Sequence, residues 1–188
     1  MKNFFFDEKV GCVCYTPTKQ DREKVDYIFS TDYRNNSLNS KTVYDRKESR
    51  MAGLFGEIAF SHYYENSEYT GRGDCTYDFI VFNKDGTNSK VDVKTKYRKV
   101  PPRNNFEASV FNYQASNNHF SEIDYYAFLS TCGNYEKIWF CGIIAKKDLT
   151  CNPNAILWKA GQVDPTNGKI FHKDTLSIFY KYLTQFTL

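Results

Sequence analysis

The chain has 188 residues, of which 41% are hydrophobic and 18% aromatic. This length fits one domain with a sizeable core, and this composition excludes a disordered chain. The formal net charge of +3 at pH 7 is too small to indicate a partner by itself. No run is long and apolar enough to span a bilayer, so a membrane partner is not expected.

The residue types that bind zinc are not grouped along the sequence. None of the six cysteines forms a C-x-x-C pair, and the three histidines are far apart. Residues 1–10 lack the apolar run of a secretory signal. We therefore expect reduced cysteines in a cytoplasmic protein. A composition rich in Asn, Lys and Tyr and poor in Leu suggests an AT-rich genome such as that of a phage, and hence a bacterial or infected host cell.

The first fifty residues are polar and weakly patterned. Alternation predicts a weak strand at Val10–Cys14, and Asp21–Ser30 could form a short helix. Thr31–Ser49 is rich in Asn, Ser and charged residues and is typical of a loop. We expect these residues to elaborate a core that begins near residue 50.

Residues 50–64 show the periodicity of a helix. Apolar side chains fall at 51, 54, 55, 58, 59, 62 and 63, which is helical spacing. Glu57 lies off that stripe, on the face of Gly53 and Ser61, so small neighbours would let its carboxylate approach another backbone or a ligand closely. Gly53 and Gly56 each cost helix stability and therefore call for a packing or functional explanation.

After residue 73 the period changes to two, which predicts strands. The predicted strands are Tyr77–Phe82, Lys90–Lys96, Phe106–Tyr113, Asp124–Ser130 and Lys137–Ala145. The first two are joined through Lys84–Gly86 in a hairpin, and the last is apolar enough to be central. Gln114–Ser121 is predicted as a short helix. A docking helix is predicted at the C-terminus, where Leu176, Phe179, Leu183 and Phe186 share one helical face.

The hairpin brings chemistry-bearing residues together. Asp92 and Lys94 share one face of their strand, about 6.5–7 Å apart along it. An odd-length loop or a bulge would place Asp78 opposite Asp92, whereas a two-residue turn would put Asp78 on the wrong face. The register of this hairpin therefore decides whether the two carboxylates meet.

Two carboxylates at close range repel each other unless a cation lies between them. Mg²⁺ or Mn²⁺ would suit such oxygen ligands and activate a water. Lys94 could orient or help deprotonate that water, or neutralise a pentacovalent phosphorane, while Glu57 could bind the metal or hold one of its waters. Each residue alone also fits an ordinary role: an exposed Asp-x-Lys pair, a strand start or a solvated helix acid.

The stretch from Gly53–Glu57 through Asp78 to Asp92-Val93-Lys94 resembles the PD-(D/E)XK nuclease superfamily, although Tyr77 stands where the motif's Pro would be. The resemblance implies an α/β fold of the restriction-endonuclease type, an αβββαβ core with a mixed central sheet flanked by helices. It implies catalytic roles for these acids and Lys94. The metal ligands would be Asp78, Asp92, Glu57 and the Val93 carbonyl.

Further residues could assist this site. The segment Lys90–Arg103 holds several Lys and Arg side chains against one acid, which suits a polyanion but also a solvated sheet edge. The candidates for phosphate contacts are Lys96, Arg98, Lys99 and Arg103, of which Lys96 shares the face of Asp92 and Lys94. Gln114 falls where some superfamily members place a Gln, and Asp74 either assists the site or caps a turn.

The sequence thus predicts one nuclease-like domain over residues 1–188, with a core at about 50–145 and elaborations at 1–49 and 146–188. The predicted activity is Mg²⁺- or Mn²⁺-dependent hydrolysis of DNA. Whether the DNA is duplex, branched or single-stranded is left open, and a homodimer is one assembly that the resemblance allows. Two alternatives remain: an inactive nucleic-acid-binding module with this fold, and a phage host-interaction protein with Asp92 and Lys94 scattered on its surface.

Overall fold

The computed structural model describes residues 3–36, 47–70, 76–112, 122–165 and 168–187. The strands are β1 (Phe4–Asp7), β2 (Cys12–Tyr15), β3 (Ser67–Tyr69), β4 (Phe79–Phe82), β5 (Asn88–Arg98), β6 (Glu107–Phe111), β7 (Tyr125–Cys132), β8 (Ile138–Ala145), β9 (Ile156–Trp158) and β10 (Thr175–Phe179). The helices are α1 (Lys19–Asn36), α2 (Lys47–Tyr63), α4 (Lys146–Cys151) and the 3-10 turn η3 (Tyr180–Tyr182).

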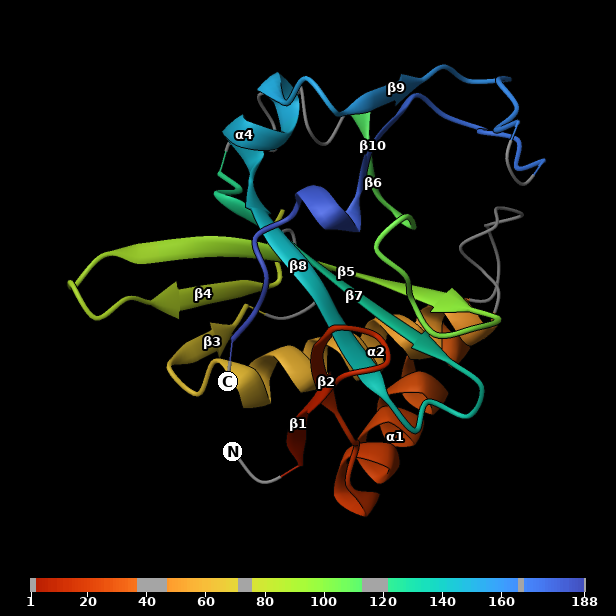
Figure 1. The fold of residues 1–188 in the computed structure, drawn as a ribbon. Coiled ribbons are helices and arrows are strands. Elements are labelled where there is room, and N and C mark those ends of the chain that lie inside the picture. The colour runs from red at the N-terminus through yellow and green to blue at the C-terminus, as the bar shows by residue number, and fades with distance from the viewer. Residues whose placement is uncertain (1–2, 37–46, 71–75, 113–121, 166–167, 188) are drawn as a thin grey trace.

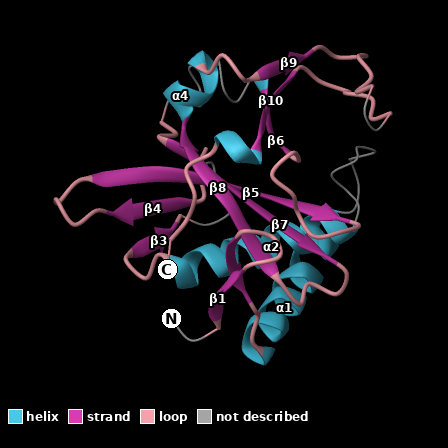
Figure 2. Cartoon of the chain, in the orientation of Figure 1, coloured by secondary structure: helices cyan, strands magenta, loops and turns pink. Residues whose placement is uncertain are grey.

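These elements form a mixed α/β fold on two sheets (Figure 1, Figure 2). The seven-stranded sheet has the order β1-β2-β8-β7-β5-β4-β3, and a separate three-stranded sheet has the order β6-β10-β9. In the large sheet β5 and β7 are parallel, while the other neighbours are antiparallel. The large sheet lies between α1 and α2 on one side and the small sheet with α4 on the other.

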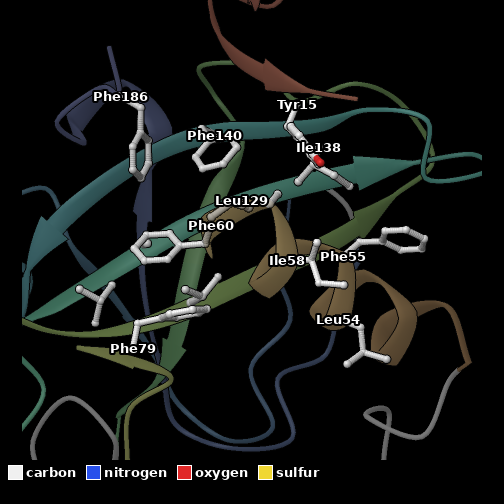
Figure 3. Close-up of a cluster of buried hydrophobic side chains, with 14 of the residues drawn as sticks. Tyr15, Leu54, Phe55, Ile58, Phe60, Phe79, Leu129, Ile138, Phe140 and Phe186 are labelled. Atoms are coloured by element: carbon white, nitrogen blue, oxygen red, sulfur yellow. The ribbon is translucent and has the colours of Figure 1, made fainter. Parts of the chain in front are cut away.

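The apolar stripe of α2 is buried against the large sheet. Leu54, Phe55 and Ile58 belong to a core that continues into Leu129 of β7 and Phe140 of β8, as Figure 3 shows. Burying such side chains is the main force that fixes the helix on the sheet. The predicted helical periodicity of this segment is therefore confirmed.

Gly56 lets α2 approach β5 closely. A Cβ atom at Gly56 would lie 1.7 Å from Oγ1 of Thr95 on β5, whereas a Cβ at Gly53 would have nothing within 4 Å. Two atoms cannot share that space, so the helix would have to move away from the strand. Of the two glycines that the sequence singled out, Gly56 is thus explained by packing.

A second core covers the opposite face of the large sheet. Tyr126 and Phe128 of β7 pack there with Ile178 of β10 and Leu149 of α4. Three of the cysteines, Cys12, Cys14 and Cys141, are buried in the same core as small apolar side chains. The small sheet and α4 therefore form a layer over the large sheet.

The strand predictions between residues 77 and 145 are confirmed, with shifted ends. The segment at 137–145 forms β8, which lies between β2 and β7 and is buried along most of its length, as expected of a central strand. The segment at 106–113 forms β6, which belongs to the small sheet instead of the large one. The helix predicted at Gln114–Ser121 lies outside the described residues.

The docking helix predicted at the C-terminus is wrong. Residues 175–179 form β10, which pairs with β6 on one side and β9 on the other, and Thr184 makes an isolated bridge with Ile143 of β8. These neighbours offer the backbone hydrogen bonds that the helix would have made internally, and the apolar spacing alone does not exclude them. Gly142, at φ 146°, leaves room for Leu183, whose Cβ would lie 2.4 Å from a Cβ at that glycine.

The N-terminal predictions are only partly right. The strand expected near residues 10–14 exists as β2, but β1 was not predicted, and it extends the sheet as an edge. The loop expected over residues 31–49 is wrong at both ends, because α1 continues to Asn36 and α2 begins at Lys47. Both helices are anchored in the core through residues nearer their middle, such as Val25 and Leu54, and extending an existing helix costs much less than starting one.

Among the described residues, no helix combines the length and the apolar character required to cross a membrane.

Candidate active site

The hairpin of β4 and β5 has the register that the sequence required for Asp78 to face Asp92. Phe79 pairs with Val91 and Phe82 with Asn88, so the residue numbers of each pair add up to 170, which is also the total of 78 and 92. The Asn83 amide donates to the Thr87 carbonyl at 2.8 Å, which leaves a three-residue loop between them. The predicted odd-length loop is confirmed.

A left-handed glycine closes this loop. Gly86 has a φ of 84°, and its amide donates to the Asn83 carbonyl at 3.1 Å. Glycine takes this conformation without the steric cost that a Cβ would add. The Asp85-Gly86 sequence therefore fixes the loop length and, through it, the face on which Asp78 lies.

Asp78 occupies the point where β4 and β5 part. Its amide still donates to the Val91 carbonyl at 3.0 Å, but its carboxylate Oδ2 accepts the next hydrogen bond, from the Val93 amide at 2.8 Å. The N–H and C=O of one strand residue point to the same edge, so the Val93 carbonyl also faces the Asp78 side. The predicted backbone ligand and the first acid thus share one edge of β5.

Asp92 and Lys94 form an ion pair beside Asp78. Asp92 is only 4% exposed, and the Lys94 Nζ lies 2.8 Å from its Oδ1 and 2.7 Å from its Oδ2. Only the first of these contacts has hydrogen-bond geometry, which leaves Oδ2 buried without a hydrogen bond. Lys94 itself is about one-third exposed at 30%, so the pair lies at the boundary between the interior and solvent.

Glu57 reaches the same place from α2. The helix approaches β5 through Gly56, and the next residue is Glu57. The hydroxyl of Tyr69 on β3 donates to the Glu57 carboxylate at 2.9 Å. Tyr69 was not predicted, because a three-residue strand gives almost no sequence signal; its position follows from its pairing with Phe79 of β4.

The three carboxylates and the lysine act on one another electrostatically. Burial, together with the charges of Asp92 and Glu57, raises the pKa of Asp78 to about 8 against the lowering effect of Lys94. Burial likewise raises the pKa of Glu57, against the lowering effect of Tyr69 and Lys94. Each of the three carboxylates is therefore close enough to interact electrostatically with the other two. One lysine does not offset the charge of three carboxylates.

This set of atoms fits a hard divalent cation. Its donors are carboxylate oxygens and a backbone carbonyl, the ligands that Mg²⁺ and Mn²⁺ prefer, and the buried Asp92 Oδ2 lacks a hydrogen bond. Within the part of the chain that the structure describes, no three His, Cys, Asp or Glu side chains are already placed around one point as ligands. The present arrangement instead has Lys94 turned onto Asp92.

The other residues predicted from the sequence do not all join this site. Lys96 and Arg98 are half-buried and both donate to the backbone carbonyl of Glu107 on β6. Lys99 and Arg103 are exposed beyond the end of β5. Asp74 and Gln114 lie outside the described residues. The structure therefore brings together Glu57, Asp78, Asp92 and Lys94, and adds Tyr69.

Comparison of the chain with protein-family models, with curated proteins and with solved structures gave no match.

Proposed function

We propose that this protein is a metal-dependent nuclease that hydrolyses phosphodiester bonds of DNA. One observation carries the proposal: Glu57, Asp78 and Asp92 converge with Lys94 where β4 and β5 part. Three carboxylates together repel one another, and a divalent cation relieves that repulsion. Such a cation, when bound, lowers the pKa of a water and stabilises charge on a phosphate under attack.

The order of elements supports a restriction-endonuclease-like fold. Helix α2 is followed by β3, β4 and β5 as an antiparallel series, and β7 then joins β5 in parallel. The PD-(D/E)XK resemblance implies a helix, three strands, a second helix and a strand. Its first acid and its (D/E)-x-K motif fall at the part of the hairpin where Asp78, Asp92 and Lys94 lie.

Each residue has a role that its position suits. Asp92 and the Val93 carbonyl of β5 would hold the cation together with Asp78, which directly precedes β4, and Glu57 would bind it or one of its waters. The ammonium of Lys94 is partly exposed and can turn from Asp92 towards a phosphate oxygen or the attacking water, where its charge would stabilise the phosphorane. Tyr69 holds the Glu57 carboxylate in place through its hydroxyl.

A second candidate is a nucleic-acid-binding module that keeps this arrangement without catalysis. The contact between Lys94 and Asp92 favours it, because the lysine satisfies a carboxylate that a metal would need. A host-interaction protein is less well supported, since that role expects Asp92 on an ordinary surface and Asp92 is 4% exposed.

Cleavage assays separate these candidates. The protein is incubated with supercoiled, linear, single-stranded and branched DNA, with Mn²⁺ or with EDTA, beside Asp92→Asn and Lys94→Met variants. Asp26→Asn and Lys24→Met on the exposed face of α1 are the matched controls. We expect Mn²⁺-dependent cleavage that the two site variants lose and the two controls keep. DNA retention without cleavage on any substrate supports the binding module instead.

A further inference from the structure

A second cluster of charges lies at the other end of β5, where the small sheet covers it. The Lys96 Nζ and the Arg98 Nη2 each lie 2.9 Å from the carbonyl oxygen of Glu107 on β6. The two nitrogens are therefore separated by no more than twice that distance. Lys169, from the connection between β9 and β10, is close enough to act on both of their charges.

Holding these three cations close together is electrostatically unfavourable. Burial lowers the pKa of Lys96 well below its usual value, and the charges of Arg98 and Lys169 lower it further. Burial also lowers the pKa of Lys169, with a further contribution from Arg98. Glu107 and Asp164 are the acids that oppose these shifts on Lys169. Like charges brought this close in a half-buried place favour an anion between them.

Arg98 is fixed in place while one of its donors stays unsatisfied. Its guanidinium carbon lies 4.7 Å from the ring centre of Phe106 and 5.4 Å from that of Tyr180, and its Nη2 also donates to the Tyr180 hydroxyl at 2.8 Å. Its Nε is buried and makes no hydrogen bond. A buried charged donor without an acceptor is destabilising, and an oxyanion supplies acceptors.

The basic cluster, which comprises Lys96, Arg98 and Lys169, lies next to the candidate active site, because its first two residues belong to the same strand as Asp92 and Lys94. Side chains alternate along a strand, so Lys96 and Arg98 lie on the face of β5 that carries Lys94, with steps of about 6.5–7 Å between successive members. The acids therefore lie at one end of a row and the cations at the other. A polyanion that lies along this row would meet both.

We propose that Lys96, Arg98 and Lys169 form a phosphate-binding site for a second phosphate group of the substrate, beside the one that is cleaved. The proposal rests on the proposed nuclease function for the identity of the substrate, but the binding itself needs neither metal nor cleavage. The phosphate is either an internal phosphodiester or a terminal phosphate of the same strand, and the two share the oxyanion chemistry that the cluster recognises.

The first experiment measures binding of inorganic phosphate in EDTA, by titration calorimetry and by the rise in melting temperature relative to the same concentration of chloride. We compare wild type with Lys169→Met and Lys96→Met. Lys147→Met, an exposed lysine of α4, is the matched control. We expect each site variant to weaken phosphate affinity about tenfold, as loss of a charge-assisted contact does, while the control keeps it.

Folding of each variant is checked by its melting temperature in chloride. Lys169 comes from a loop, so its variant remains informative even where Lys96→Met unfolds. If folded Lys169→Met binds inorganic phosphate as wild type does, the proposal is overturned and the cluster only ties the small sheet to β5. The same conclusion follows if wild type shows no preference for phosphate over chloride.

A second experiment distinguishes the two sources of the phosphate. Oligonucleotides with and without a 5′-phosphate, and with and without a 3′-phosphate, are bound to the metal-free protein. If the site binds a terminal phosphate, removing that phosphate should weaken binding to wild type as much as Lys169→Met does. If the site binds an internal phosphodiester, Lys169→Met should weaken the binding of every oligonucleotide by the same factor. This experiment does not measure cleavage, so its result stands even if the nuclease assay fails. If the protein cleaves DNA but Lys169→Met binds phosphate as wild type does, only this inference is overturned.

Discussion

Two charge clusters that include residues of β5 are assembled in different ways. In the middle of the strand, Asp92 and Lys94 meet Asp78 of the same hairpin, whose loop has three residues, and only Glu57 and Tyr69 come from neighbouring elements. At the far end, Lys96 and Arg98 meet β6 and a loop that lies some seventy residues later in the chain. The acidic cluster, which comprises Glu57, Asp78 and Asp92 with Lys94, is thus formed largely by residues close together in the chain. The basic cluster exists only because the small sheet folds over the strand.

This difference has a consequence for mutations. A change in the acidic cluster alters charges that the hairpin holds in register, so we expect such a change to reduce the proposed cleavage while the fold persists. A change in the basic cluster also touches the contacts between the two sheets, because Arg98 donates to both Glu107 and Tyr180. The predictions below separate chemical effects from structural ones in each cluster.

The largest expected effect is the loss of cleavage in Asp92→Asn. The substitution keeps the shape of the side chain but removes the negative charge that a metal needs, and we expect metal-dependent cleavage to fall by about 10³-fold or more. The initial rate on the best DNA substrate in Mn²⁺ measures it, with Asp26→Asn as the control. Cleavage at the wild-type rate by folded Asp92→Asn contradicts the assignment of the active site.

The next prediction concerns the approach of α2 to the acidic cluster. A methyl group at Gly56 would lie 1.7 Å from Thr95 Oγ1, so Gly56→Ala should lower the free energy of unfolding by about 1–3 kcal/mol through overpacking. Gly53→Ala has nothing within 4 Å and should instead stabilise the helix by up to about 1 kcal/mol. Chemical denaturation of both variants measures the difference, and equal stabilities would show that the helix lies farther from β5.

The pH dependence of stability tests whether the acidic cluster is strained without metal. The pKa of Asp78 is raised from 3.8 to about 8 in the folded protein, so folding favours the protonated form. Its contribution is therefore complete at pH values below about 4 and is lost as the pH rises towards 8. In EDTA, we expect the melting temperature of wild type to fall over this range more than that of Asp78→Asn.

The control for that titration is Mn²⁺. A cation bound by the acidic cluster favours the ionised carboxylates, so it should restore stability near pH 8 in wild type and have less effect on Asp78→Asn. A melting temperature that falls equally in both proteins with pH, and responds equally to Mn²⁺, contradicts the strained cluster.

A smaller effect is expected from Tyr69→Phe. The variant loses the hydrogen bond that holds Glu57 but keeps the ring, and we expect about a tenfold loss in cleavage or in Mn²⁺ affinity. Measuring kcat and KM together with Mn²⁺ affinity shows which of these changes. Tyr27→Phe, at a residue that is 70% exposed, is the matched control. Identical kinetics of Tyr69→Phe and wild type would remove Tyr69 from the site.

The smallest effect is expected beyond the end of β5. Lys99 is exposed and makes at most a phosphate contact, so Lys99→Met should weaken DNA binding by a few-fold on all sequences and reduce the slope of log affinity against log salt by about one. Binding in EDTA at several salt concentrations measures it. An unchanged slope places Lys99 outside the DNA contact.

Much of the acidic cluster could be predicted from the sequence. The alternation of residues 90–96 placed Asp92 and Lys94 on one face, and the Asp85-Gly86 turn made an odd-length loop possible, which the structure confirms. The helical stripe over residues 50–64 likewise predicted α2, because apolar periodicity reports which face is buried. These features depend on residues close together in the chain, so the local sequence is enough to predict them.

The tertiary structure alone decided the rest. The apolar spacing near the C-terminus predicted a helix, but β6 and β9 supplied hydrogen bonds that made Thr175–Phe179 a strand. The approach of Glu57 depended on Gly56 meeting Thr95, and the meeting of Lys169 with Arg98 depended on the small sheet. Such contacts join residues far apart in the chain, so no local pattern encodes them. The sequence determined which groups could react, and the packing of distant elements determined which of them meet.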